Sequence, residues 1–157
     1  MSEKIFIHGL ESSNQGTKSV FFRKKFPDMI IPTFTGDLQE RMKRLRALLS
    51  DKSGIRLVGS SFGGLMASIF AMEHEPRVEK MVLLAPAIHM MKFSPHKTKK
   101  ISIPVWIYHG KGDQVIPLAD VEPIARETFL TLSFHVVDDD HYLHKTFKHI
   151  DWNSLLA

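Results

Sequence analysis

Residues 55–64, IRLVGSSFGG, decide the fold, because they join a short apolar run to a serine between glycines. The run Ile55–Val58 is typical of a buried strand. The stretch Phe62–Glu73 carries apolar residues at helical spacing and is followed by Pro76, which indicates a helix. The sequence therefore predicts a strand, a sharp turn that contains Ser61, and a helix in direct succession.

The rest of the chain repeats this alternation of strands and helices. Further apolar runs end in glycine, proline or aspartate, and the one at 29–32 is weak: Ile5–Ile7, Met29–Pro32, Val78–Leu84, Pro104–Tyr108 and Leu132–Val137. Helices are expected at Thr17–Lys25, Asp37–Ser50, Asp120–Phe129 and Tyr142–Ile150. Such alternation builds a mainly parallel sheet with helices on both faces. We expect a single α/β domain over residues 1–157 with about six strands.

Length and composition exclude several classes of protein. The chain has 157 residues, of which 43% are hydrophobic and 24% charged, as in an ordinary globular domain. It contains no cysteine, which excludes disulfides, thiolate zinc sites and a cysteine nucleophile. The net charge of +4 comes from several segments and does not indicate a nucleic-acid partner.

The sequence also lacks the patterns of membrane and exported proteins. Its apolar runs are shorter than the ~18 residues that a membrane span requires. The first expected strand begins at Ile5 and leaves no room for a signal peptide. We therefore expect a cytoplasmic protein without a membrane partner, and no motif indicates a cofactor or a metal.

Ser61 occupies the centre of a G-x-S-x-G motif at residues 59–63. A serine on a sharp strand-to-helix turn has strained backbone angles, and small residues two positions away allow the strand and helix to approach. The backbone N–H of Phe62 would be free at the helix N-terminus, where it can stabilise an oxyanion. Ser60 does not have this spacing. We expect Ser61 to be a nucleophile.

A serine hydroxyl needs a base, and the base needs a carboxylate to orient it. Asp113 lies in HGKGDQVIP, residues 109–117, and His141 ends DDDH, residues 138–141. Each segment follows a predicted strand, and the carboxyl ends of parallel strands share one edge of a sheet. We expect Asp113 and His141 to meet Ser61 there. His144 is the alternative base, and we expect 138–140 to be a solvated loop.

The second oxyanion donor is expected in HGLESS, residues 8–13, after the first strand. Gly9 allows the backbone to turn, so that the Leu10 N–H can lie beside that of Phe62. The polar residues 12–14 either line the mouth of the site or cap the following helix, and capping is favoured. Glu11 is compatible with both placements.

The four segments HGLESS, GSSFGG, HGKGDQVIP and DDDH together resemble the α/β-hydrolase superfamily, and most closely its small, lidless bacterial esterases. The resemblance extends from Ile5 to about His144. It implies an α/β-hydrolase fold in which Ser61 is the nucleophile, Asp113 the acid and His141 the base. It also implies Leu10 and Phe62 as oxyanion donors. Compared with larger members, the chain lacks two N-terminal strands, and residues 85–102 replace the usual helix or lid.

This replacement segment carries an apolar half and a basic half. Met90, Met91 and Phe93 are expected to form a wall of the substrate pocket. The lysines at 97, 99 and 100 either attract an anionic substrate or keep the loop soluble. Because the segment is too short for a helical lid, short acyl chains are the expected substrates.

The sequence thus predicts a serine hydrolase that cleaves a small-molecule carboxylic ester through an acyl-enzyme intermediate. A thioesterase or an amidase would use the same three residues. A non-catalytic binding protein with the same fold is the alternative from another class. Such proteins usually lose a member of the triad, and none of the three is missing here.

Overall fold

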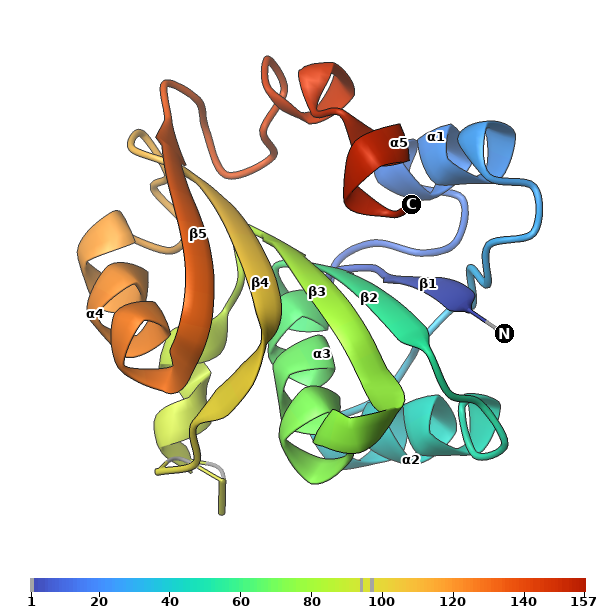
Figure 1. Cartoon of the computed structure of the whole chain (residues 1–157). Coiled ribbons are helices and arrows are strands. Elements are labelled where there is room, and N and C mark those ends of the chain that lie inside the picture. Colours follow the sequence, from blue (N-terminus) through green and yellow to red (C-terminus); the bar gives the residue numbers. More distant parts are fainter. Residues whose placement is uncertain (1, 94, 97) are drawn as a thin grey trace.

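The computed structural model describes residues 2–93, 95–96 and 98–157, without the side chain of Phe93. Within these residues lies one parallel sheet of five strands, in the order β1-β2-β3-β4-β5 (Figure 1). The strands are β1 Glu3–Ile7, β2 Ile55–Ser60, β3 Val78–Leu84, β4 Ile101–Gly110 and β5 Phe129–Val137. Because all strands are parallel, their carboxyl ends share one edge.

Helices cover both faces of the sheet. The α-helices are α1 Thr17–Lys25, α2 Leu38–Leu48, α3 Phe62–Glu73, α4 Leu118–Thr128 and α5 Trp152–Leu155. Short 3₁₀ helices are η1 Glu75–Arg77, η2 Ile88–Phe93 and η3 Phe147–His149. Buried residues of α2, α3 and α4 share one core cluster, and those of α1 and α5 share another. Figure 1 shows the corresponding separation, with α1 and α5 together on the face opposite α3.

The central helix α3 is buried along nearly its whole length, from Phe62 to Met72. A helix that is apolar on all sides belongs in the interior of a domain. Here it packs against β2 of the sheet and beside α2 and η2 in the first core cluster. The start of α3, directly after Ser61, is therefore fixed by the core rather than by a flexible surface loop.

The second core cluster contains a group of aromatic rings that joins the two ends of the chain. Phe22 of α1 lies 4.8 Å from Trp152 of α5 and 5.4 Å from Phe147, measured between ring centroids. Phe6 of β1 lies 5.0 Å from the same Phe22 ring. Phe22 and Trp152 are fully buried. These contacts hold α1 beside the C-terminal segment (Figure 1).

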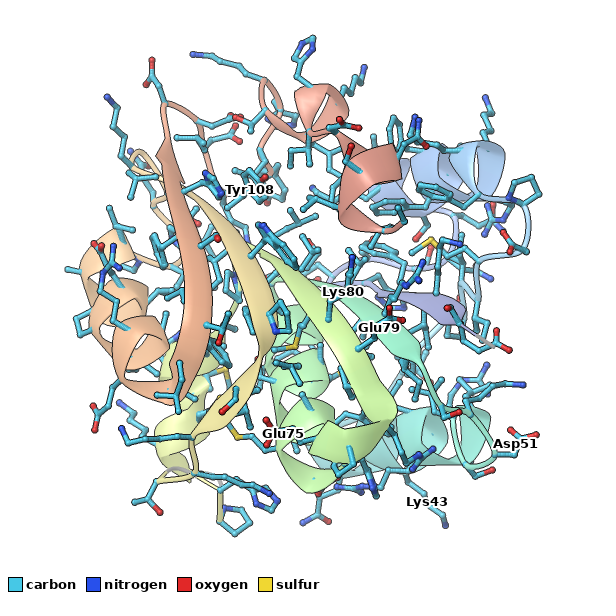
Figure 2. The ribbon with its side chains drawn as sticks, in the orientation of Figure 1. Lys43, Asp51, Glu75, Glu79, Lys80 and Tyr108 are labelled. Atoms are coloured by element: carbon cyan, nitrogen blue, oxygen red, sulfur yellow. The ribbon has the colours of Figure 1, made fainter. Side chains whose placement is uncertain are left out.

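Next to this cluster, the same face of the sheet carries longer polar and aromatic side chains. Lys80 of β3 projects there on the side of the C-terminal segment, and Tyr108 of β4 lies on the side of β5 (Figure 2). The Lys80 ammonium lies 5.6 Å from the centroid of the Trp106 ring, and Tyr108 stacks on His135 at 4.6 Å. This part of the face is thus covered by its own side chains.

Most expected elements are confirmed. The helices at 17–25 and 62–73 have the expected bounds, and Asp37 caps α2 in a capping box with Glu40. The helix expected from Asp120 begins two residues earlier, at Leu118. In place of the weak strand at 29–32, Ile30 forms a single parallel bridge to Ile5. The sheet therefore has five strands where about six were expected.

The helix expected at 142–150 is wrong. The structure has turns in the first part of this range, followed by the short 3₁₀ helix η3 in its second part. Leu143 has a φ of 55°, which no α-helix allows. Aspartate side chains of the preceding loop accept the N–H groups of residues 142, 144, 145 and 146. Aspartate competes in this way with helical hydrogen bonding, so the apolar spacing of the segment was a misleading signal.

Candidate active site

Ser61 stands on the sharp turn between β2 and α3. Its φ of 55° and ψ of −117° lie outside the regions that residues with a side chain prefer. A Cβ at Gly59 would overlap the carbonyl of Gly63, and a Cβ at Gly63 would overlap that of Ile7. The Ser61 N–H donates to the carbonyl oxygen of Leu84 over 2.9 Å. The two glycines and this bond to β3 hold the serine in its strained conformation.

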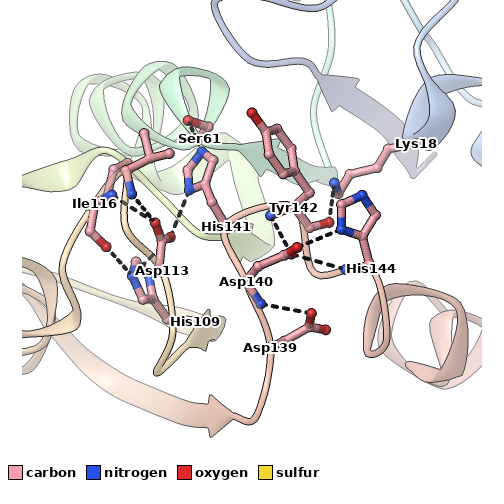
Figure 3. A network of polar contacts seen from close by, with 11 residues as sticks. Lys18, Ser61, His109, Asp113, Ile116, Asp139, Asp140, His141, Tyr142 and His144 are labelled. Atoms are coloured by element: carbon pink, nitrogen blue, oxygen red, sulfur yellow. Dashed lines mark hydrogen bonds and ion pairs between the residues drawn. The ribbon is translucent and has the colours of Figure 1, made fainter.

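A chain of hydrogen bonds connects Ser61, His141 and Asp113 (Figure 3). Ser61 Oγ lies 3.1 Å from His141 Nε2, and His141 Nδ1 lies 2.7 Å from Asp113 Oδ2. The other oxygen of Asp113 accepts the N–H groups of Val115 at 2.9 Å and Ile116 at 2.8 Å. A proton on Nδ1, held by the carboxylate, leaves Nε2 free to accept the serine proton.

The sheet brings these three residues together from distant parts of the sequence. Ser61 follows β2, Asp113 lies in the loop after β4, and His141 lies in the loop after β5. The last two loops are in direct contact, since a Cβ at Gly110 would overlap the carbonyl of Asp139. The structure thus brings together the three residues that were predicted from their positions after strands. The alternative base His144 lies elsewhere: its side chain is 71% exposed and pairs with Asp140 at 2.6 Å.

Asp139 organises the loop that carries His141, a role that the sequence analysis missed. It was expected to be solvated but is only 7% exposed. Its carboxylate accepts N–H groups from Asp140 at 2.8 Å, Lys145 at 3.0 Å and Thr146 at 2.7 Å. Burial opposes ionisation, but these hydrogen bonds hold the pKa of Asp139 below its usual range.

His109 supports Asp113 from the opposite side to His141. Its Nε2 donates to the carbonyl oxygen of Ile116 over 2.8 Å and lies 3.4 Å from Asp113 Oδ2. The ring is fully buried, and burial lowers the pKa of His109 below its usual value. A neutral His109 therefore fixes the same Ile116 whose N–H binds Asp113. The sequence placed His109 only at the end of a strand.

His8 fixes the loop that contains the expected second oxyanion donor. Its Nδ1 donates to the carbonyl oxygen of Gly9 at 2.7 Å, and its Nε2 accepts the N–H of Phe34 at 2.8 Å. Burial lowers the pKa of His8, in agreement with a neutral ring that both donates and accepts. A Cβ at Gly9 would lie 3.4 Å from the Cβ of Ser61, so the loop runs directly against the serine.

The two expected oxyanion donors are close to Ser61 in the chain or in space. Leu10 follows Gly9, and Phe62 is the first residue of α3. Both residues line the cavity beside Ser61. Within the described part of the chain, neither backbone N–H has a hydrogen-bond acceptor. Two free N–H groups beside a serine are suited to bind a developing oxyanion.

A cavity of about 760 Å³ opens in front of Ser61 and His141. Apolar side chains form much of its wall, among them Phe6, Leu10, Phe62, Met90, Ile116, Leu143 and Phe147. A cavity of this size holds a small organic molecule. Glu11 and Ser12 also line it.

The structure corrects the expected cavity wall at Met91. Met90 lines the cavity, but the neighbouring Met91 is 1% exposed and packs in the first core cluster. The 3₁₀ turn of η2 points successive side chains in different directions, which explains the contrast. The side chain of Phe93 lies outside the described residues.

The structure also corrects the expected capping of α1 by residues 12–14. The N-cap of this helix is Gly16, and no side chain caps it.

Lys99 and Lys100, the described lysines after η2 that were singled out in the sequence, do not line the cavity. The Lys99 ammonium donates to the carbonyl of Met72, and that of Lys100 donates to the carbonyl of Glu127 over 2.8 Å. Lys97 lies outside the described residues. Both described lysines thus attach their segment to neighbouring helices.

The described residues show neither a metal-binding cluster nor a membrane-spanning helix. No group of three or more His, Asp or Glu side chains in residues 2–93, 95–96 and 98–157 is arranged to hold a metal ion. Among the same residues, no helix has the length and apolar character needed to cross a membrane.

Comparisons with known proteins agree with this architecture. None of the curated proteins matches the sequence significantly. Est1E from Butyrivibrio proteoclasticus, solved with ferulic acid bound, has 14% identity and a TM-score of 0.78 over 96% of this chain and 85% of its own. An esterase from Pyrococcus furiosus has 17% identity and a TM-score of 0.73 over 98% and 79% of the two chains.

A third solved structure, the mouse alpha/beta hydrolase domain-containing protein 10, has 17% identity and a TM-score of 0.73. The match covers 89% of this chain and 82% of that one. At these identities the likeness shows the fold. The family described as "alpha/beta hydrolase fold" also matches the sequence over residues 12–102, more than half of the chain and including the turn at Ser61. On the sequence match and the shared architecture, the chain belongs to the alpha/beta hydrolase fold family.

Proposed function

We propose that the protein is a serine hydrolase that cleaves a carboxylic ester of a small molecule through an acyl-enzyme intermediate. The observation that carries this proposal is the continuous hydrogen-bond chain from Ser61 through His141 to Asp113. It ends at a cavity lined by Leu10 and Phe62, whose backbone N–H groups have no acceptor in the described chain. A nucleophile, a base, an orienting carboxylate and oxyanion donors are the four parts that acyl transfer requires.

The proposed reaction has two halves. Ser61 Oγ attacks the ester carbonyl carbon while His141 Nε2 takes the hydroxyl proton. The carboxylate of Asp113 stabilises the resulting imidazolium, and the N–H groups of Leu10 and Phe62 bind the oxyanion. The C–O bond then breaks, and the alcohol leaves with the proton from His141. A water molecule, activated by the same histidine, attacks the acyl-enzyme and releases the acid.

An ester is the proposed substrate, although the same residues act on thioesters and amides. One solved structure with this fold is named an esterase, and another, Est1E, was solved with ferulic acid bound. Initial rates on matched p-nitrophenyl esters, thioesters and anilides rank the three substrate classes directly.

A fluorophosphonate probe tests the proposal because it reacts readily with an activated serine and hardly at all with an ordinary one. Labelling should stop in Ser61→Ala and persist in Ser60→Ala, the matched control one position away. Mass spectrometry of the labelled peptide should place the adduct on residue 61. A folded wild-type protein that is not labelled, and that hydrolyses none of the three substrate classes, would instead be a binding protein.

A further inference from the structure

Lys18 is a cation built into the wall of the cavity. It is the second residue of α1 and lines the same cavity as Ser61 and His141. Its Nζ donates to the carbonyl oxygen of Tyr142 over 2.8 Å, as Figure 3 shows, and lies 5.3 Å from the centroid of the Phe147 ring. The ammonium is therefore fixed next to the residue that follows His141.

This ammonium has no carboxylate partner among the described residues. The two nearby acids are occupied elsewhere: Asp140 pairs with His144 at 2.6 Å, and Asp139 binds backbone N–H groups of its own loop. A lysine ammonium has three N–H donors, and within the described chain only one of them has an acceptor. Two charged donors thus remain for a ligand.

The surroundings strengthen any bond that these donors make. Lys148 also lines the cavity, and Glu11 is the only acidic residue among the described residues of the lining. The neighbouring wall is apolar at Leu143 and Phe147, which reduces screening by water. Burial lowers the pKa of Lys18, while Asp140 and Asp139 act in the opposite direction. A bound anion would offset the cost of this burial.

We propose that the natural substrate is an ester that bears a carboxylate, and that Lys18 binds this carboxylate through its free N–H donors. This inference rests on the proposed function, because it concerns the substrate of the same site. It defines Lys18 as a specificity-determining residue and the substrate as a small anionic ester rather than a neutral one.

Two pairs of esters test the proposal, one for each half of the substrate. p-Nitrophenyl hydrogen glutarate and p-nitrophenyl valerate have acyl chains of equal length and differ in a terminal carboxylate. 4-Carboxyphenyl acetate and 4-carbamoylphenyl acetate place the same contrast in the alcohol half. We expect kcat/KM to favour the anionic member of at least one pair by about tenfold, the usual effect of a hydrogen bond to a charged group.

Lys18→Met should abolish this preference, because methionine keeps an apolar stem near Phe147 but removes the charge. The variant also loses the bond to Tyr142 and can disturb His141, which would lower both rates. The ratio of anionic to neutral kcat/KM cancels that common loss. Lys18→Arg should retain the preference, and Lys24→Met, an exposed position on the same helix, should leave it unchanged.

The outcomes separate this inference from the proposed function. If Ser61-dependent hydrolysis occurs but neither pair favours the anion, or if Lys18→Met keeps the preference, the inference is wrong and the proposed function stands. If no ester is hydrolysed, calorimetric binding of 4-carboxyphenyl acetate to Ser61→Ala decides the matter. Binding that Lys18→Met weakens about tenfold supports the anion site, and binding that is absent or unaffected overturns it.

Discussion

His141 and His144 are three residues apart and both are close to an aspartate, yet their surroundings differ. The His141 side chain is 10% exposed and reaches Ser61, whereas that of His144 is 71% exposed and pairs with its neighbour Asp140. A base must lie within hydrogen-bond reach of the proton that it removes. Position, rather than residue type, therefore separates the proposed base from its neighbour.

The first prediction contrasts these two histidines. His141→Ala should reduce kcat by several orders of magnitude, because loss of a triad member costs on the order of 10⁶ in a serine protease. His144→Ala should change kcat by less than about tenfold. Ester hydrolysis by the two purified variants, with circular dichroism to verify folding, measures the contrast. A reversal of the two phenotypes would make His144 the base.

At the level of elements, the loop after β5 owes its shape to Asp139. The carboxylate binds backbone N–H groups on both sides of His141, from residue 140 to residue 146. A buried carboxylate with several N–H donors can fix a loop without any regular secondary structure. The proposed base thus depends on a residue that does not itself touch Ser61.

The second prediction replaces this carboxylate. Asp139→Asn exchanges one acceptor oxygen for an NH₂ group, and should lower the free energy of unfolding by about 1–3 kcal/mol at pH 7. The exposed Asp138→Asn should have little effect. Because the pKa of Asp139 is lowered by folding, its stabilisation is present above the unfolded value near 3.9.

That stabilisation is lost as the pH falls through the lower pKa of the folded state. The difference between wild type and Asp139→Asn should therefore shrink as the pH falls below about 4. Urea unfolding at pH 7 and at pH 3.5 measures it. An equal difference at both values would show that the charge of Asp139 does not stabilise the loop.

Local sequence patterns correctly predicted the helices that are stabilised by a capping residue or by an apolar face against the core. The capping residue Asp37 and the helical spacing of the apolar residues in 62–73 gave correct helices. The stretch 142–150 failed because side chains of the preceding loop take its N–H groups. That competition depends on where Asp139 lies in three dimensions, which spacing along the chain does not encode.

The same distinction applies to the candidate site. Ser61, Asp113 and His141 were predictable, since each follows a strand and parallel strands end at one edge. Lys18 was not, because its contact with Tyr142 spans 124 positions of sequence and no motif surrounds it. His109 was visible as a strand-end residue, but its bond to Ile116 depends on how the loop folds back.

At the scale of the whole molecule, buried histidines connect stability to pH. Burial lowers the pKa values of His8 and His109, so both are favoured in the neutral form by folding. The unfolded chain therefore binds more protons than the folded one below the usual histidine value near 6.5. Stability should fall as the pH falls through this range.

The third prediction isolates one of these histidines. From pH 7.5 to pH 5.5, wild type should lose more stability than His109→Gln, by at most about 1.4 kcal/mol per pH unit for one group. Denaturant unfolding of both proteins across this range gives the two slopes. Parallel slopes would mean that His109 titrates alike in the folded and unfolded states.

The fourth prediction concerns the size of the acyl group. Between β3 and β4 the described chain forms η2 rather than a helical lid, and Met90 is 36% exposed at the cavity wall. Each further methylene would gain little of the ~0.8 kcal/mol that full burial supplies. We expect kcat/KM on p-nitrophenyl esters to be highest for acyl chains of about two to six carbons. A maximum at decanoate or beyond would require a deeper apolar channel.

The aromatic cluster that joins Phe6, Phe22 and Trp152 has a consequence for how the protein is made. A ribosome synthesises Phe6 and Phe22 early and Trp152 late, on the order of ten seconds apart at the usual rate. During that time the nascent chain carries large aromatic surfaces that nothing yet covers. His141 is also synthesised late, so a chain stalled before it would lack the proposed base and would hydrolyse nothing. Such stalled chains are the ones that we expect chaperones to bind.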